Sequence, residues 1–329
     1  MKYKYLFLLI LCIPLTSLGQ KPDSLLKKLD SLDKKVDSTG TQKNNISLGA
    51  YNETTKITSS TYFVLLWSNY KQQFSAPLHI GSKGWGTIGK FAVLTGGLAF
   101  ADKPIQKQAI KFKSTSQTAA SISSFITNTG GQYEMITLGA IGAYGFIFKD
   151  EKMKTTTFLA SQAYLTSAGV SYVIKFLSGR QRPSVFSENR VTANPTFKGP
   201  FANLGRDENG KKLNSSFPSG HTTVAFAAAT VYAMEYRIKP WVPIVSYSAA
   251  SLIGLSRLTE NKQWATDVLV GSALGYLSGR QVVNNYHRYA KVKREDAGKT
   301  EIQKKKGGRV SFILTPVHGY MLAGLRYLP

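Results

Sequence analysis

The sequence predicts an all-α protein folded as a helical bundle. Two observations support this prediction: the apolar runs between residues 62 and 287 have the length of helices, and strand-like alternation is largely absent from that region. Six runs carry the pattern: Phe91–Ala101, Met135–Phe148, Thr155–Ile174, Thr222–Tyr236, Trp241–Ser256 and Asp267–Gly279. They predict six or seven helices, each buried along one face and some nearly all round.

Glycine spacing is a third observation in favour of a bundle. Gly271, Gly275 and Gly279 recur every fourth residue of the last run, so they share one helix face without side chains. Another helix backbone can approach such a face closely, either in a membrane or in a tight bundle outside one. We therefore expect a second helix to pack against this face.

Residues 1–19 have the pattern of a secretory signal peptide. Lys2 and Lys4 precede an apolar run, and small or polar residues follow it up to Gly19. The run is shorter than the roughly 18 to 20 apolar residues of a spanning helix, so cleavage near Gly19 is favoured over a permanent anchor. We expect an exported protein, either periplasmic or associated with an envelope membrane.

The composition excludes several classes of protein. Of the 329 residues, 43% are hydrophobic, which is too many for a disordered tail, and the single cysteine, Cys12, rules out a disulfide framework. The 42 basic and 18 acidic residues are spread along the chain. This charge favours an anionic membrane surface or phosphate-bearing substrates as partners, and nucleic acid is not expected for an exported protein.

Residues 20–58 form a polar N-terminal segment with one short amphipathic helix. Its apolar stripe consists of Leu25, Leu29, Leu32 and Val36. Such a stripe is typical of a spacer helix or, alternatively, of a docking or dimerisation helix. We expect no chemistry in this segment, and the sequence leaves the oligomeric state open.

Residues 59–288 are expected to form the helical domain, whose relation to a membrane the sequence leaves open. Thr155–Ile174 is uncharged for 20 residues but contains Thr, Ser, Gln and Tyr throughout, and the other runs are shorter than a bilayer requires. The mean hydropathy of the chain is -0.14. A periplasmic or surface-bound bundle is favoured over an integral membrane protein.

The C-terminal part divides into two segments. Residues 289–308 are strongly basic and are interpreted as a solvated linker or, alternatively, as an arm that binds lipid headgroups. Residues 309–329 contain two apolar stretches separated by a Pro- and Gly-containing turn, which predicts a small β-hairpin.

Three separated clusters carry groups suited to holding a phosphate. In the first, Lys175 and Arg182 are seven residues apart at a helix end, so both cations could face the same side, although Pro183 pushes Arg182 toward an extended backbone. Arg binds an oxyanion through its planar fork and Lys binds it as a point charge. Alone, this cluster is also typical of an ordinary basic helix end.

The second cluster is Pro218-Ser219-Gly220-His221, immediately before an apolar helix. Backbone N–H groups at a helix start bind anions, and the Ser219 hydroxyl can add a hydrogen bond. Gly220 lets the backbone approach an oxyanion, and His221 is placed to give a proton to a leaving oxygen. The alternative is that Ser219 simply caps the helix.

The third cluster runs from Ser256-Arg257 to Asp267. Arg257 ends one expected helix, and Gln263 begins the next. Gln263 and Asp267 are four residues apart and would share a helix face. Together the three clusters, in this order, form a pattern that is far more specific than any of them alone.

The three clusters together resemble the motifs of the type 2 phosphatidic acid phosphatase superfamily, which includes bacterial class A acid phosphatases and vanadium haloperoxidases. The resemblance implies a helical bundle that holds phosphate without a metal or other cofactor. The implied phosphate-binding groups are Lys175, Arg182, Ser219, the Gly220 backbone and Arg257. It also implies that His221 is the general acid and that Asp267 orients the nucleophile.

The sequence departs from the family pattern at the nucleophile. The family has a histidine at the position of Gln263, and an amide is a poor nucleophile that forms no phosphohistidine. Two functions therefore stay open. One is a phosphatase that acts on phosphate monoesters, lipid phosphates or lipid pyrophosphates in the cell envelope. The other is a non-catalytic protein, a pseudophosphatase, that binds phosphate or a phospholipid headgroup.

Overall fold

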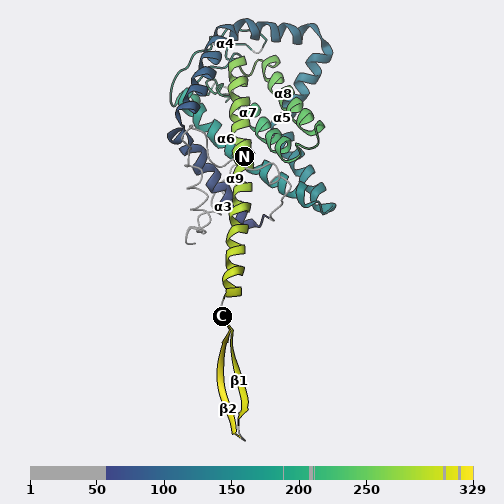
Figure 1. The fold of residues 1–329 in the computed structure, drawn as a ribbon. Coiled ribbons are helices and arrows are strands. Elements are labelled where there is room, and N and C mark those ends of the chain that lie inside the picture. The colour runs from purple at the N-terminus through teal and green to yellow at the C-terminus, as the bar shows by residue number, and fades with distance from the viewer. Residues whose placement is uncertain are drawn as a thin grey trace.

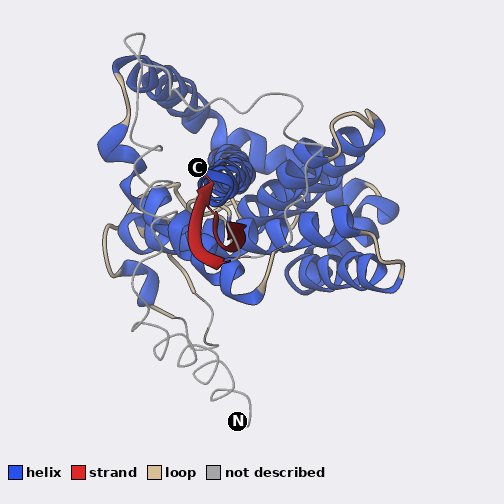
Figure 2. Ribbon diagram, turned by 60° about the horizontal axis from the view of Figure 1, so that its bottom comes forward, coloured by secondary structure: helices blue, strands red, loops and turns tan. Residues whose placement is uncertain are grey.

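The chain folds into a helical bundle followed by a two-stranded hairpin (Figure 1). The computed structural model describes residues 57–187, 189–206, 210, 212–306, 309–317 and 320–328. The elements in this part of the chain are α3 (Ser59–Ser75), η3 (Ala76–His79), α4 (Ser82–Thr115), α5 (Gln117–Ile147), α6 (Glu151–Ser178), η4 (Ala202–Leu204), α7 (Gly220–Glu235), α8 (Trp241–Thr259), α9 (Ala265–Lys306), β1 (Arg309–Val317) and β2 (Tyr320–Leu328). Figure 2 shows that helices dominate the fold and that, among the described residues, strands occur only in the hairpin.

Helices α7 and α9 form the central pair of the bundle. At each of three glycines of α9, an added Cβ would lie within 2.7 Å of a backbone carbonyl oxygen of the segment from Ser219 to Ala227; the glycines are Gly271, Gly275 and Gly279. Real Cβ atoms do not approach that closely, so the two backbones can meet only because these residues are glycines. The prediction that another helix packs on this glycine face is confirmed.

The main apolar core lies between α3, α5, α6, α7 and α9. It contains Leu159 of α6, Val231 of α7 and Val282 of α9, all fully buried. Burial of such side chains provides most of the favourable free energy of folding. The core therefore holds together α6, α7 and α9, three of the helices whose ends carry the predicted clusters.

Each of the six predicted runs coincides with an observed helix, although two of them extend one residue past it, at Phe148 and Tyr236, and the structure adds one helix that the apolar pattern missed. The buried residues of α3 are Leu65 together with the polar Ser68, Asn69 and Gln72. Asn69 donates to Gln162 of α6, and Gln72 donates to Asn285 of α9. Because α3 packs through amides rather than through an apolar stripe, hydrophobic periodicity did not reveal it.

The C-terminal segments differ in part from expectation. Residues 289–306, expected as a linker, continue α9, which suits a segment without proline and rich in the helix-forming Lys, Arg, Glu and Gln. Figure 1 shows α9 extending past the other helices toward the hairpin. The hairpin is confirmed: β1 pairs antiparallel with β2, from Arg309 opposite Leu328 to Val317 opposite Tyr320.

The predicted signal peptide and nearly all of the segment 20–58 lie outside the described residues. Within the described part of the chain, none of the helices has the combination of length and apolarity needed to cross a bilayer.

Candidate phosphate site

The three clusters come together where four helices begin or end. Lys175 lies in the last turn of α6, Ser219 precedes the first residue of α7, Arg257 lies in the last turn of α8, and Asp267 lies in the first turn of α9. Residues far apart in sequence therefore contribute to one region. Helix termini supply unpaired backbone groups as well as side chains at this point.

Lys175 and Arg182 reach the site by a different route from the one expected. Helix α6 ends at Ser178, and Gly179 follows with a left-handed backbone (φ 51°), so the two cations do not share a helix face. Lys175 Nζ instead donates to the carbonyl oxygens of Ser215 (2.9 Å), Ser216 (3.3 Å) and Pro218. Arg182 donates to the Ser215 hydroxyl through Nε (3.1 Å) and Nη2 (2.9 Å). The chain just before α7 therefore holds both cations.

The start of α7 carries the second cluster. Ser219 occupies the N-cap position, but its hydroxyl bonds to the Thr222 hydroxyl at 2.8 Å and does not cap the helix backbone. The alternative that Ser219 simply caps the helix is therefore wrong. A Cβ at Gly220 would lie 3.4 Å from Lys175 Cε, so the glycine leaves room for the lysine beside the helix start. The first N–H groups of α7 have no intrahelical acceptor and add to the positive potential there.

His221 lies within the electrostatic field of three cations. Burial lowers the pKa of His221 to about 3, and the charges of Arg257, Lys175 and Arg182 add to the shift. Burial also lowers the pKa of Lys175 to about 7, with Arg182, Arg257 and Lys212 acting in the same direction and Asp267 opposing them. Such shifts arise where like charges are held close together and partly away from water. The arrangement suits an oxyanion, which would relieve this repulsion.

Gln263 and Asp267 contact the segment before α7 through Ser216. Gln263 precedes α9, which begins at Ala265, so the two residues do not share a helix face as expected. Asp267 accepts hydrogen bonds from Trp264 N (2.8 Å), Arg180 Nη1 (2.6 Å) and the Ser216 hydroxyl. The same hydroxyl lies 3.4 Å from Gln263 Oε1. Ser216 therefore contacts both side chains, and both Gln263 and Asp267 are buried.

Three buried residues next to Asp267 were not predicted from the sequence. Arg180 bridges Asp102 of α4 and Asp267, at 2.6 Å from each, and Thr266 bonds to both Asp102 and Arg180. Arg180 and Asp102 are 2% and 0% exposed. The sequence contains one signal for Asp102, because it is the only acidic residue in the lysine-rich stretch 91–115. A single carboxylate in a helix that packs on a core needs a partner.

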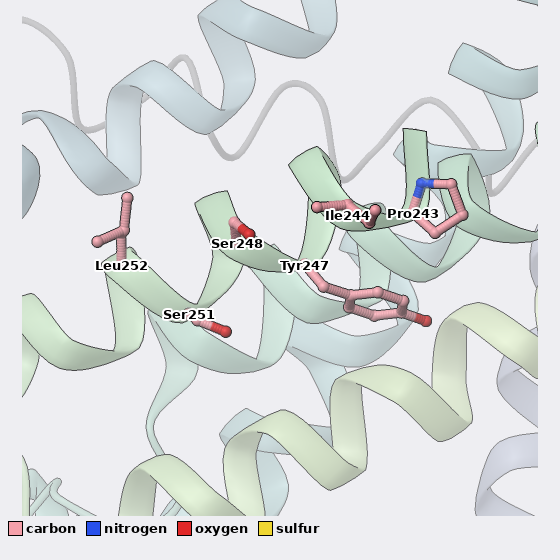
Figure 3. Close-up of a pocket in the computed structure, with 6 residues that line it drawn as sticks. All are labelled: Pro243, Ile244, Tyr247, Ser248, Ser251 and Leu252. Carbon is pink, nitrogen blue, oxygen red and sulfur yellow. The ribbon is translucent and has the colours of Figure 1, made fainter. Parts of the chain in front are cut away.

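Two cavities lie elsewhere on the described part of the molecule. One of 620 Å³ is lined by six residues of α8 alone, without a charged side chain (Figure 3). The other, of 470 Å³, is lined mainly by apolar residues of α5, α6, α7 and α8, among them Val224, Ala225 and Ala228 of α7. Because Val224 is three residues after His221, the second cavity begins about one helical turn from the phosphate site.

Residues 156–290 match the family model described as the PAP2 superfamily. This segment contains all three motifs, so the resemblance to the type 2 phosphatidic acid phosphatases is confirmed. A lipid A 1-phosphatase of Porphyromonas gingivalis is 48% identical over 66 residues, which are 20% of this chain and 15% of that protein. The match thus spans less than a sixth of that relative's length.

Two solved structures are also similar to this chain. A transmembrane PAP2-type phosphatidylglycerolphosphate phosphatase from Bacillus subtilis has 22% identity and a TM-score of 0.41, covering 59% of this chain and 91% of that one. LpxE of Aquifex aeolicus has 22% identity and a TM-score of 0.39, covering 54% of this chain and 93% of that one.

Proposed function

We propose that this chain, which resembles the PAP2 superfamily over residues 156–290, binds the phosphate group of a phosphate-bearing lipid in the cell envelope, and that Gln263 leaves it little hydrolytic turnover. The observation that carries the proposal is the group of three cations, Lys175, Arg182 and Arg257, gathered around His221 at the start of α7. A phosphate bound there would accept hydrogen bonds from these cations, from the Ser219 hydroxyl and from the first N–H groups of α7.

His221 would act as the general acid toward a leaving oxygen. Burial, together with the charges of Arg257, Lys175 and Arg182, keeps His221 in its neutral form, since its pKa is about 3. A bound phosphate dianion would neutralise much of that field and raise the pKa of His221, so the imidazole would gain its proton when the ligand is present. The acid function thus depends on occupancy of the site.

Gln263 is the reason for expecting little turnover. An amide has no basic lone pair with which to attack phosphorus, so no covalent intermediate forms at this position. The amide retains hydrogen-bonding groups at a similar reach. We therefore expect phosphate binding and the proton donor, His221, to remain, although the covalent intermediate does not form.

The apolar cavity beside α7 supports a lipid as the source of the phosphate. Its lining residues, which include Val224, Ala228 and Tyr232, provide an apolar surface that begins about one turn from His221. An Ala228→Phe substitution would fill part of that space. We expect it to weaken binding of short-chain phosphatidic acid and to leave the affinity for inorganic phosphate unchanged, as measured by calorimetry.

The outer surface supports contact with an anionic membrane. Helices α4, α5 and α8 expose large apolar side chains, among them Trp85, Phe100, Phe112, Phe146 and Trp241. Exposed apolar groups on a chain with a formal charge of +24 suit a bilayer that carries acidic headgroups. Export of the chain, expected from its first residues, would place this surface in the envelope.

The experiment that tests the proposal is binding to vesicles that contain phosphatidic acid, with phosphatidylglycerol vesicles of equal surface charge as the reference. We expect the unmodified chain to prefer phosphatidic acid, since its phosphate is a monoester, and we expect Arg257→Gln to lose that preference. The exposed Arg280 offers a control of equal charge change, Arg280→Gln. Equal binding of the unmodified chain to both vesicle types would contradict the proposal.

A second candidate function is metal-independent hydrolysis of phosphate monoesters or of lipid phosphates and pyrophosphates, which the position of His221 favours. It is measured as inorganic phosphate released from para-nitrophenyl phosphate and from phosphatidic acid. Release by the unmodified chain that disappears in His221→Ala would establish this function. Release that persists in His221→Ala would exclude the proposed general acid.

A further inference from the structure

Helix α4 contributes only two buried side chains among its described residues, and both are polar. They are Asp102 and Gln106, four residues apart and therefore on one helix face. A buried carboxylate is costly unless it is paired and hydrogen-bonded. Their partners therefore show what the inner face of α4 holds in place.

Asp102 contacts the two segments that flank the phosphate site. Its Oδ2 accepts from Arg180 Nη2 at 2.6 Å and from Thr266 Oγ1 at 2.7 Å, and its Oδ1 accepts from Thr266 N at 3.0 Å. The last contact pairs an N–H of the first turn of α9, which has no acceptor within its own helix. Asp102 therefore holds both the chain after α6 and the start of α9.

Arg180 connects Asp102 to Asp267, which lies at the site. Its second nitrogen, Nη1, donates to Asp267 Oδ1 and to Thr266 Oγ1, at 2.6 Å each. Its guanidinium lies over the Phe197 ring at 4.9 Å and near the Phe217 ring at 5.9 Å. Charge-assisted hydrogen bonds from both nitrogens, together with a ring on one face, fix the plane of the guanidinium.

Asp267 in turn joins the network to the phosphate-binding groups. Its carboxylate accepts from the Ser216 hydroxyl, and its carbonyl oxygen accepts from Ser219 N at 3.0 Å. The carbonyl of Ser216 receives a hydrogen bond from Lys175. A displacement of Asp267 would therefore move Ser216, which accepts a hydrogen bond from Lys175, and Ser219, which precedes α7.

Gln106, the other buried side chain of α4, holds the end of α8 through similar hydrogen bonds. Its Nε2 donates to the carbonyl oxygen of Leu258 at 2.7 Å and to Asn261 Oδ1 at 3.0 Å. Leu258 directly follows Arg257. Gln106 thus contacts the end of α8 and the residue Asn261 that follows it, while Asp102 contacts the first turn of α9.

We infer that Asp102 is a positioning residue that acts through Arg180, Thr266 and Asp267 to fix the geometry of the phosphate site. The inference rests on the proposed function, because it assigns these residues to the support of phosphate binding. Asp102 lies on a helix outside the three motifs, and it does not contact the ligand position itself. Helix α4 then stabilises the geometry of the site, in addition to forming an outer layer of the bundle.

The test compares phosphate affinity in variants that remove a buried group inside and outside this network. Asp102→Asn removes the charge with little change in shape. Glu235→Gln removes another buried carboxylate, which is hydrogen-bonded to His287 at 2.7 Å. Affinity for inorganic phosphate is measured by calorimetry at a temperature where circular dichroism shows every variant to be folded. We expect Asp102→Asn to weaken binding by about tenfold or more and Glu235→Gln to leave it unchanged.

A milder pair covers the case in which Asp102→Asn does not fold. Thr266→Val removes a buried hydroxyl that bonds to Asp102 and Arg180, while Thr266→Ser retains it. We expect weaker phosphate binding in the valine variant and restored binding in the serine variant. Unchanged affinity in Asp102→Asn or Thr266→Val, or an equal loss in Glu235→Gln, would overturn the inference. Absence of binding by the unmodified chain would overturn the phosphate site itself, and the inference with it.

Discussion

Two buried groups of charged residues lie at opposite ends of α7, and they differ in how their charges are balanced. At one end, Glu235 and His287 form a pair at 2.7 Å, both almost fully buried. At the other end, Arg180 bridges Asp102 and Asp267, and three more cations lie around His221. The first group is a balanced pair, while the second has more positive than negative charge.

This difference separates a structural ion pair from a binding site. The hydrogen bond between Glu235 and His287 joins α7 to α9. At the start of α7, burial and then the neighbouring cations lower the pKa of Lys175, and a bound anion would relieve the repulsion among these cations. Burial of charge alone does not identify the site, but unbalanced charge does.

The largest effect is expected from restoring an imidazole at the position of Gln263. Gln263→His supplies a nucleophile beside Ser216 and the cations, and we expect phosphate release from para-nitrophenyl phosphate to rise by roughly 10⁴-fold or more, as judged from the cost of removing a catalytic nucleophile. The added substitution His221→Ala should abolish the gain. A Gln263→His variant that binds phosphate but releases none from para-nitrophenyl phosphate would show that the site lacks more than its nucleophile.

The next effect concerns the surplus charge itself. Arg257 is buried at the end of α8 and lowers the pKa of His221, so we expect Arg257→Gln to weaken phosphate binding by about 100-fold, in line with the loss of one or two charge-assisted hydrogen bonds. Calorimetric titration gives the affinity. Arg280→Gln removes one exposed cation as the control, and an equal loss there would mean that only net charge matters.

A smaller effect is expected from pH, because Lys175 has a pKa of about 7. Sulfate keeps its charge across neutral pH and is a suitable probe. As the pH rises through 7, Lys175 of the free protein loses its proton, so sulfate affinity should fall by up to about tenfold per pH unit. The slope should vanish in Lys175→Met. A pH-independent affinity in the unmodified chain would contradict the account of Lys175.

The same group gives a stability effect of opposite sign. The folded pKa of Lys175 lies below the ordinary value of 10.5, so the unfolded chain binds more protons between pH 7 and 10.5. Without ligand, this lysine should therefore make the free energy of unfolding increase with pH across that window. Urea titrations of the unmodified chain and of Lys175→Met measure the difference, which should lessen as the pH approaches 10.5.

The smallest effect on binding is expected at the balanced pair. Glu235→Gln leaves His287 buried without its carboxylate and should lower the free energy of unfolding by about 3 to 5 kcal/mol, as for other broken buried pairs. Phosphate affinity of the folded variant should not change. Denaturant titration and calorimetry on the same sample check both parts, and a change in affinity would mean that the two ends of α7 are coupled.

Much of the fold and of the site could be predicted from the sequence because both depend on local patterns. The apolar runs identified six helices, and the order of the three motifs identified Lys175, Ser219 and Arg257 as neighbours. Helix α3 was missed because its buried face carries amides. Hydrophobic periodicity detects apolar faces only.

The support of the site could not be predicted because it depends on contacts between distant residues. Asp102 is 78 residues from Arg180 and 164 residues from Thr266, and no local pattern links them. The path from Lys175 to Arg182 was also misjudged, because the left-handed Gly179 ends the helix between them. Such features follow from tertiary packing, which the sequence specifies only through the complete fold.

The central claim is that the surplus cations at the start of α7 bind phosphate although the nucleophile is absent. The most direct measurement is a calorimetric titration of inorganic phosphate into the unmodified chain, with Arg257→Gln titrated beside it. We predict saturable binding of one phosphate per chain that is lost or greatly weakened in Arg257→Gln. No saturable binding by the unmodified chain, or equal binding by both proteins, would contradict the claim.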